Sequence, residues 1–259
     1  MIGLFDSGVG GLSVLKAIVQ NNINEDFIYF GDTKNVPYGT KTKEQILSYT
    51  HDIMRFFIDK HVDIAIMACN TSSALVYEEL NKEFSNKIKI CPLIQNAAPY
   101  FKNENNTIGV ISTNATAKSH AYTKEILKYN SSAKIVELEC QKFVEIVEKR
   151  LYNDASSIEY IKNKAEFLKQ SACKKVILGC THFPYLVPIL TKFAPDIEFI
   201  DPANYLIKAI KNELTNIGAQ KNNSTYRFYV SSNPENFQQS GSLFFDIKEP
   251  AELIEFARV

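Results

Sequence analysis

A strand-like apolar run followed by a cysteine occurs twice in this chain of 259 residues. Asp63–Thr71 has the sequence DIAIMACNT, and Lys174–His182 has the sequence KKVILGCTH. A second pair of segments, Ile2–Ser7 (IGLFDS) and Ile108–Thr113 (IGVIST), recurs at a similar separation of about 110 residues. Two motifs that recur in the same order at nearly the same offset indicate two related halves.

Short β-rich runs alternate with helical patterns along the chain, and this alternation predicts β-α-β units with largely parallel sheets. The expected strands are Ile2–Phe5, Phe27–Phe30, Ile64–Ala68, Ile88–Pro92, Thr107–Ser112, Lys134–Leu138, Lys175–Leu178, Glu198–Ile200 and Tyr226–Val230. The expected helices are Leu12–Gln20, Lys43–Lys60, Ser72–Phe84, Ala117–Tyr129, Ser157–Ser171, Tyr185–Phe193, Leu206–Leu214 and a terminal helix, Ala251–Arg258.

We therefore predict an α/β fold with two pseudo-symmetric α/β domains whose mainly parallel sheets face a central cleft. Residues 1–97 together with 208–259 would form a discontinuous first domain, and residues 98–207 the second. Apolar strands followed by small polar residues occur in any α/β protein, but here the two cysteines also fall in register. Ligands of open α/β sheets bind beyond the carboxyl ends of the strands, so both cysteines belong at the cleft.

Charge and composition exclude several classes of protein. Lys+Arg and Asp+Glu balance at 29 each, which argues against nucleic acid as the main partner. No run approaches the roughly 20 apolar residues that span a bilayer, so we expect no membrane association. The N-terminal segment Met1–Asp6 has no basic region and is predicted to be a first strand, not a signal peptide. Five scattered cysteines without a C-x-x-C pair indicate a reducing, cytoplasmic location and no structural zinc site or disulfide framework.

Cys69 and Cys180 are the candidate reactive residues, because each stands between a strand and small polar residues that favour the start of a helix. The unsatisfied N–H groups at a helix N-terminus favour the thiolate form of a cysteine. A single cysteine is more often a small buried apolar residue, and Cys91, Cys140 and Cys173 are interpreted in that way.

Two thiols that face each other suit the inversion of a stereocentre next to a carboxylate. One sulfur removes a proton from one face of the carbon while the other returns a proton to the opposite face. General acid–base catalysis contributes about 10²–10⁴-fold, so positioning and electrostatic stabilisation must supply much of the remaining rate. Hydroxyls and N–H groups at Ser7, Asn70, Thr71 and Thr181 are placed to hold the substrate carboxylate.

Four motifs in order resemble those of glutamate racemase, in the aspartate/glutamate racemase family, and the resemblance covers nearly the whole chain. They are Phe5–Gly11 (FDSGVGG), Gly31–Thr33 with Val36–Gly39 (GDT, VPYG), Ala68–Ala74 (ACNTSSA) and Leu178–Pro184 (LGCTHFP). The resemblance implies interconversion of L- and D-glutamate without pyridoxal phosphate, another cofactor or a metal. It also implies a supply of D-glutamate to peptidoglycan biosynthesis in the bacterial cytoplasm, and a homodimer.

The resemblance also assigns roles to residues. It implies that Cys69 and Cys180 are the acid/base pair and that Asp6 and His182 support proton transfer at the first and second thiol. The implied substrate contacts are Asp6, Ser7, Tyr38, Gly39, Asn70, Thr71, Thr113, Thr116, Thr181 and His182, with Ser112 as a further small hydroxyl.

One segment departs from the family pattern. Cys140–Lys149 lacks the usual proline-containing apolar run that ends in an acid, so the acid that assists the histidine is either Glu148 or is replaced by Lys149.

Other interpretations of single residues stay open. Asp6 could cap the following glycine-rich turn, and Gly39 could serve a turn. The turn after the first strand resembles a dinucleotide loop, but Ser13 stands where the third glycine is needed. His182 could bind zinc with Cys180, although partner ligands are lacking nearby.

The sequence leaves two alternative functions open. A related racemase acting on aspartate or another amino acid would carry the same pair of thiols, because the residues do not encode the length of the substrate side chain. A binding or regulatory protein with a vestigial cleft would not need both cysteines and their polar neighbours.

Overall fold

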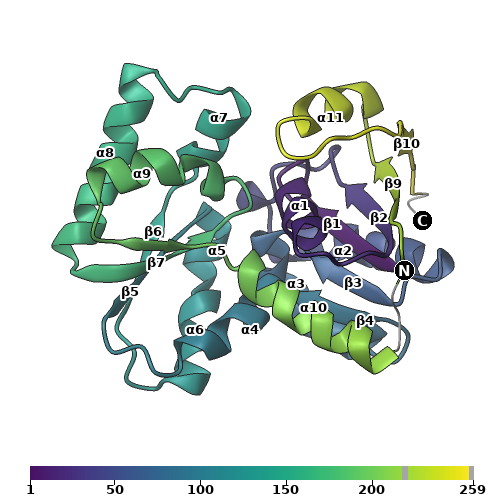
Figure 1. Ribbon diagram of the computed structural model, residues 1–259, viewed down its shortest axis with the longest axis horizontal. Helices are drawn as coiled ribbons and strands as arrows, with labels where there is room; N and C mark the ends of the chain where they lie inside the picture. The colour runs from purple at the N-terminus through teal and green to yellow at the C-terminus, as the bar shows by residue number, and fades with distance from the viewer. Residues whose placement is uncertain (218–220, 257–259) are drawn as a thin grey trace.

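The computed structural model describes residues 1–217 and 221–256, whose strands form two parallel sheets (Figure 1). The first sheet has the strand order β10-β9-β2-β1-β3-β4, and the second has the order β6-β5-β7-β8. The strands of the first sheet are β1 (Ile2–Asp6), β2 (Asp26–Gly31), β3 (Ile64–Met67), β4 (Lys89–Pro92), β9 (Thr225–Val230) and β10 (Ala251–Leu253). Those of the second are β5 (Thr107–Ser112), β6 (Ile135–Glu139), β7 (Cys173–Gly179) and β8 (Glu198–Ile200).

Helices connect the strands and cover the sheets. The α-helices are α1 (Leu12–Gln20), α2 (Lys43–Asp59), α3 (Asn70–Phe84), α4 (Leu93–Ala97), α5 (Asn114–Ser119), α6 (Ala121–Tyr129), α7 (Lys142–Glu148), α8 (Ala155–Gln170), α9 (Val187–Phe193), α10 (Ala203–Ile217) and α11 (Pro234–Gly241). The 3-10 helices are η1 (Tyr38–Thr40), η2 (Ala98–Phe101) and η3 (Phe183–Leu186). Among the described residues, no helix has the length and apolar character that a membrane span requires.

The two sheets repeat one topology. The order β2-β1-β3-β4 in the first sheet matches β6-β5-β7-β8 in the second, so β1 corresponds to β5 and β3 to β7. These are the strands that carry the two repeated sequence motifs. In Figure 1 the sheets lie side by side in separate halves of the molecule, which confirms the predicted pair of α/β domains.

The chain returns to the first half after β8. Helix α10 packs against α1 and α4, and β9 and β10 then extend the first sheet beside β2. The domain boundaries at 97/98 and 207/208 stay a prediction, and the second of them lies inside α10. Buried side chains from both halves share one apolar cluster, as Leu12, Phe183 and Phe244 illustrate.

The predicted terminal helix is wrong over the described residues of Ala251–Arg258, whose last two residues lie outside them. Ala251–Leu253 forms the edge strand β10, and the N–H of Ile254 donates to the carbonyl of Val230 at 2.8 Å. The ring of Phe256 stacks on Phe30 at 5.4 Å. The open edge of β9 and this apolar contact outweigh the local helix propensity, since propensity is a weak prior that tertiary context overrides.

The helix predicted over Ala117–Tyr129 is interrupted. His120 has a φ of 53° in the left-handed region, and it separates α5 from α6. Helix α5 (Asn114–Ser119) begins directly after Thr113, at the end of β5, and α6 begins at Ala121. This geometry places Thr116 and Tyr122, on the two short helices, in the buried interior.

Candidate active site

The repeated strands end at one cleft between the two halves. Seventeen residues line this cleft: Asp6, Ser7, Gly8, Val36, Pro37, Tyr38, Gly39, Cys69, Asn70, Thr71, Thr113, Gln141, Val144, Glu148, Cys180, Thr181 and His182. Every predicted site residue is among them except Thr116 and Ser112, which are buried behind the lining. The cleft therefore brings together residues that are far apart in sequence.

The two candidate cysteines line this same cleft from opposite halves. Cys69 stands between β3 and α3, with one residue between it and the end of β3, and Cys180 directly follows β7. Their side chains are nearly buried, at 5% and 7% exposure, and both are free thiols. Cys91, Cys140 and Cys173 are also free and buried, but they do not line the cleft.

Burial dominates the environment of Cys69. It raises the pKa of the thiol to about 12, and the nearby negative charge of Asp6 acts in the same direction. Hydrogen bonds from the N–H groups of Ser72 and Thr71, at the start of α3, act in the opposite direction. The N–H groups at the helix N-terminus do favour the Cys69 thiolate, as expected, but desolvation of the charged form outweighs those bonds and the pKa rises.

The second cysteine has a different environment. Cys180 Sγ lies 3.6 Å from His182 Nδ1, and His182 Nε2 lies 3.1 Å from Glu148 Oε1. Burial lowers the pKa of His182, but the hydrogen bonds to Cys180 and Glu148 outweigh burial and raise this pKa to about 10. With this raised pKa the His182 ring keeps its proton at neutral pH.

Glu148 is the acid next to the histidine. The alternative, Lys149, points to the surface and forms an ion pair with Glu145 at 2.8 Å. Within residues 1–217 and 221–256, no three His, Cys, Asp or Glu side chains are grouped so as to hold a metal ion.

The charge on His182 predicts a pH dependence of stability. Its pKa in the folded state, about 10, lies above the ordinary value of 6.5. The stabilisation from its pairing is therefore fully present below pH 6.5 and is lost as the pH rises through about 10. We expect the difference in unfolding free energy between wild type and His182→Asn to shrink over this range, measured by denaturant titration at a series of pH values. A difference that stays constant from pH 6.5 to 10 would contradict the imidazolium assignment.

Asp6 both caps a turn and lines the cleft. Its Oδ2 accepts hydrogen bonds from the N–H groups of Gly8 at 3.3 Å and Gly11 at 3.1 Å. The capping role left open by the sequence is thus present. It holds the carboxylate at the end of β1, near enough to Cys69 to affect its pKa.

The turn at Tyr38–Gly39 is held by a buried carboxylate that the sequence did not single out as functional. Asp32 accepts hydrogen bonds from the Tyr38 hydroxyl at 2.6 Å, the Ser231 hydroxyl at 2.6 Å and the Asn35 amide at 2.9 Å. Across the cleft, a Cβ on Gly39 would lie 2.7 Å from Gln141 Oε1, so the absence of a side chain allows the two halves to approach.

We expect Asp32→Asn to destabilise the protein by about 2 kcal/mol, because an amide group would oppose donors that now meet a carboxylate. The Michaelis constant for the substrate should rise as well, since the Tyr38–Gly39 turn lines the cleft. Thermal and denaturant unfolding measure the first effect. A variant as stable as the wild type would show that this hydrogen-bond network contributes nothing.

Hydrogen bonds between the halves converge on the cleft. The hydroxyls of Thr71, Thr113 and Thr116 are mutually bonded, at 3.0 Å between Thr71 and Thr113, 3.0 Å between Thr113 and Thr116 and 3.3 Å between Thr116 and Thr71. Thr116 therefore reaches the cleft through the other two threonines and does not line it. Ser13, in α1, donates to the carbonyl of Thr181 at 3.1 Å.

Five lining residues were not predicted as site residues: Gly8, Val36 and Pro37, which lie within the quoted sequence motifs, and Gln141 and Val144, which do not. Gln141 and Val144 belong to the segment around α7, for which no helix was predicted. Phe143, Ile146 and Val147 are buried at the i, i+3 and i+4 spacing of a helix face, and this pattern would have predicted the helix.

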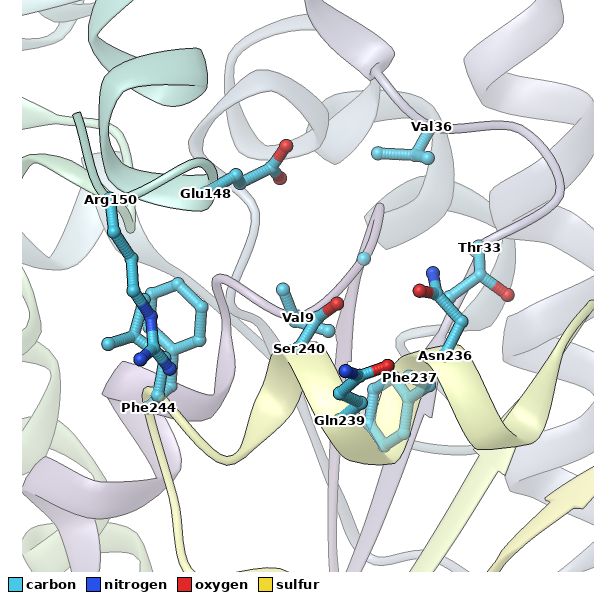
Figure 2. A pocket seen from close by; sticks show the side chains of 12 residues that line it. Val9, Thr33, Val36, Glu148, Arg150, Asn236, Phe237, Gln239, Ser240 and Phe244 are labelled. Atoms are coloured by element: carbon cyan, nitrogen blue, oxygen red, sulfur yellow. The ribbon is translucent and has the colours of Figure 1, made fainter.

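The cleft is nearly closed, and a larger cavity adjoins it. The cleft has a volume of about 30 Å³, room for about one or two water molecules. The neighbouring cavity, of about 550 Å³, shares Gly8, Val36 and Glu148 with the cleft. Figure 2 shows this cavity between Glu148 and Arg150 of the second half and the side chains of α11.

Comparisons with known proteins agree with this geometry. The Asp/Glu/Hydantoin racemase family model matches residues 2–210. The glutamate racemase of Nostoc sp. is 37% identical over 261 residues, covering 100% of this chain and 89% of the relative. The structure of Francisella tularensis glutamate racemase in complex with D-glutamate matches with a TM-score of 0.90 and 32% identity, over 98% of this chain and 97% of that chain.

An aspartate racemase is similar in fold alone. The Picrophilus torridus enzyme matches with a TM-score of 0.58 and 18% identity, over 94% of this chain and 98% of that chain. The family predicted from the four sequence motifs is thus confirmed by the full-length matches to glutamate racemases. This chain belongs to the Asp/Glu/Hydantoin racemase family.

Proposed function

We propose that this protein is a glutamate racemase that interconverts L- and D-glutamate by proton transfer at two cysteines, without a cofactor. The observation that carries the proposal is the presence of Cys69 and Cys180 on opposite halves of one cleft. Similarity to glutamate racemases over the full chain supports glutamate as the substrate.

The two sulfurs take different roles in a given direction of the reaction. Cys180, whose Sγ lies 3.6 Å from His182 Nδ1, is the base that removes the α-proton. Cys69, with its raised pKa, is the thiol that returns a proton to the opposite face. One C–H bond breaks as an S–H bond forms at Cys180, and the S–H bond of Cys69 breaks as a new C–H bond forms.

After one turnover the protons have exchanged places. The thiolate that is now at Cys69 accepts hydrogen bonds from the N–H groups of Thr71 and Ser72. These bonds partly offset the cost of burying its negative charge. In this state the protein is ready for the reverse reaction. Asp6 at the first thiol, and His182 with Glu148 at the second, support proton transfer.

Polar groups at the strand ends hold the substrate. Ser7, the Tyr38–Gly39 turn, Asn70–Thr71 and Thr181 line the cleft, and Thr116 supports Thr71 and Thr113 from behind. The N-terminus of α3, at Asn70–Thr71, lines the cleft, and its positive dipole end suits the α-carboxylate.

Substrate entry requires the two halves to separate. A cavity of about 30 Å³ does not hold an amino acid, so the described structure corresponds to a closed form. Glutamate would enter from the adjoining cavity, past Glu148 and Val36, and closure would then exclude water from the reacting carbon.

In the cell, the product D-glutamate would supply peptidoglycan biosynthesis in the cytoplasm, and the chain would act as a homodimer. These assignments rest on the resemblance to glutamate racemases.

Loss of optical rotation tests the proposed function. Purified protein without added cofactor should racemise L-glutamate and should act far more slowly on L-aspartate. Faster turnover of L-aspartate would assign the alternative substrate, and no turnover of either amino acid would leave a binding protein as the better interpretation. Such a binding protein would keep its ligand affinity when either thiol is replaced by alanine.

A further inference from the structure

The side chain of Asn70 is held from the opposite half of the molecule. The hydroxyl of Tyr122, in α6, donates to Asn70 Oδ1 at 2.6 Å. Asn70 is the first residue of α3 and lines the cleft, whereas Tyr122 is fully buried and does not line it. The bond therefore joins a cleft residue of the first half to an interior residue of the second.

This bond determines which end of the amide is available to a ligand. An asparagine side chain offers one acceptor oxygen and one NH₂ group with two donors. Burial raises the pKa of Tyr122 well above its ordinary value, so the phenol keeps the proton that it donates. With Oδ1 engaged, Nδ2 is left for the cleft, and within residues 1–217 and 221–256 no hydrogen bond engages Nδ2.

The hydroxyl of the next residue, Thr71, is not free to donate a hydrogen bond to a ligand. The protons of Thr71, Thr113 and Thr116 are shared among the three hydroxyls, so a bond from Thr71 to a ligand would disrupt that ring. The Asn70 amide is thus the side-chain donor at the start of α3 that is free to meet an anion.

The ring of Tyr122 lies beside Gly179, the residue that precedes the second cysteine. A Cβ on Gly179, the residue before Cys180, would lie 3.1 Å from Tyr122 Cε2. Tyr122 therefore contacts the strand end that carries one base and holds the residue that follows the other base. Phenylalanine would preserve these ring contacts and remove only the hydroxyl.

We propose that Tyr122 is a positioning residue that orients the Asn70 amide, so that its NH₂ group meets a carboxylate of the bound amino acid. The proposal rests on the proposed racemase function. Without the Tyr122 hydroxyl the amide can rotate by half a turn and present its oxygen to the anionic ligand, which weakens binding.

Tyr122→Phe should raise the Michaelis constant for glutamate about tenfold, because it misorients a hydrogen bond to a charged group. The turnover number should change less. Tyr229→Phe is the matched control: it removes the hydroxyl of another buried tyrosine, packed against Phe56 outside the cleft, and should leave both kinetic constants unchanged.

Binding in a second background separates orientation from a general loss of structure. Ligand-observed NMR with equilibrated D- and L-glutamate should show about tenfold weaker binding for Tyr122→Phe than for wild type. In an Asn70→Ala background the same change should weaken binding less than about twofold, because the amide is already absent. Equal weakening in both backgrounds, or no effect of Tyr122→Phe, would overturn the proposal.

A measurement on the unaltered protein covers the case in which Tyr122→Phe does not fold. The side-chain NH₂ resonances of Asn70, assigned by their absence in Asn70→Ala, should shift when glutamate is added. Resonances that do not move would overturn the proposal alone. A wild-type protein that neither racemises nor binds glutamate would overturn the proposed function and this inference with it.

Discussion

Replacing either Cys69 or Cys180 with alanine should lower the rate of glutamate racemisation by about a thousandfold or more. Each sulfur transfers a proton on one face of the α-carbon, and the methyl group of alanine cannot accept or donate one. The fold should persist, because the change removes only one atom from a nearly buried side chain. Polarimetry measures the rate, and circular dichroism the fold.

Cys91→Ala is the control for this experiment. It makes the same change at a buried cysteine in β4 that does not line the cleft, so activity should stay near the wild-type level. Residual racemisation above a few per cent in either cleft variant would assign the proton transfer to another residue.

Gly10→Ala should lower the turnover number about a hundredfold, because displacements near 1 Å in a catalytic group cost about that factor. A Cβ at this position would lie 2.3 Å from Thr181 Oγ1 and 2.5 Å from His182 Cε1. Both side chains must move, and the imidazole would then leave its position beside Cys180.

Gly109→Ala separates this effect from simple crowding. Its Cβ would lie 2.8 Å from Val176 and 3.0 Å from Leu168, in the core of the second sheet and away from the cleft. That variant should lose stability but keep the turnover number of its folded fraction. A Gly10→Ala variant that keeps the full turnover number would show that catalysis does not depend on the position of His182 beside Cys180.

The sequence predicted the interior strands of the sheets but not the edge strand β10. Apolar runs such as Ile64–Met67 are buried on both faces, so burial and local pattern agree there. The segment Ala251–Leu253 has a helical pattern but forms a strand that pairs with β9. Helix α11 lies between the two strands in sequence, so this pairing is not a local contact. The local sequence pattern of Ala251–Leu253 does not reveal that β9 leaves a sheet edge open for it to pair with.

The site was predictable wherever a residue lies at or just after the end of a repeated strand, as Asp6, Cys69 and Cys180 do. Gln141, just before α7, was missed, since only tertiary packing brings it opposite Gly39. The protonation of Cys69 was also beyond the sequence. The helix N-terminus is visible in the sequence, but the burial that outweighs it is a property of the closed cleft.

Racemisation of L-glutamate in D₂O tests the two-sulfur mechanism most directly. If Cys69 and Cys180 flank one carbon, D-glutamate formed in the first turnovers should carry deuterium at the α-position, because the thiol that delivers the proton exchanges with solvent. Unreacted L-glutamate should keep its protium at that stage. D-glutamate that retains protium throughout would mean that a single group carries the proton from one face to the other, and the two-cysteine mechanism would be wrong.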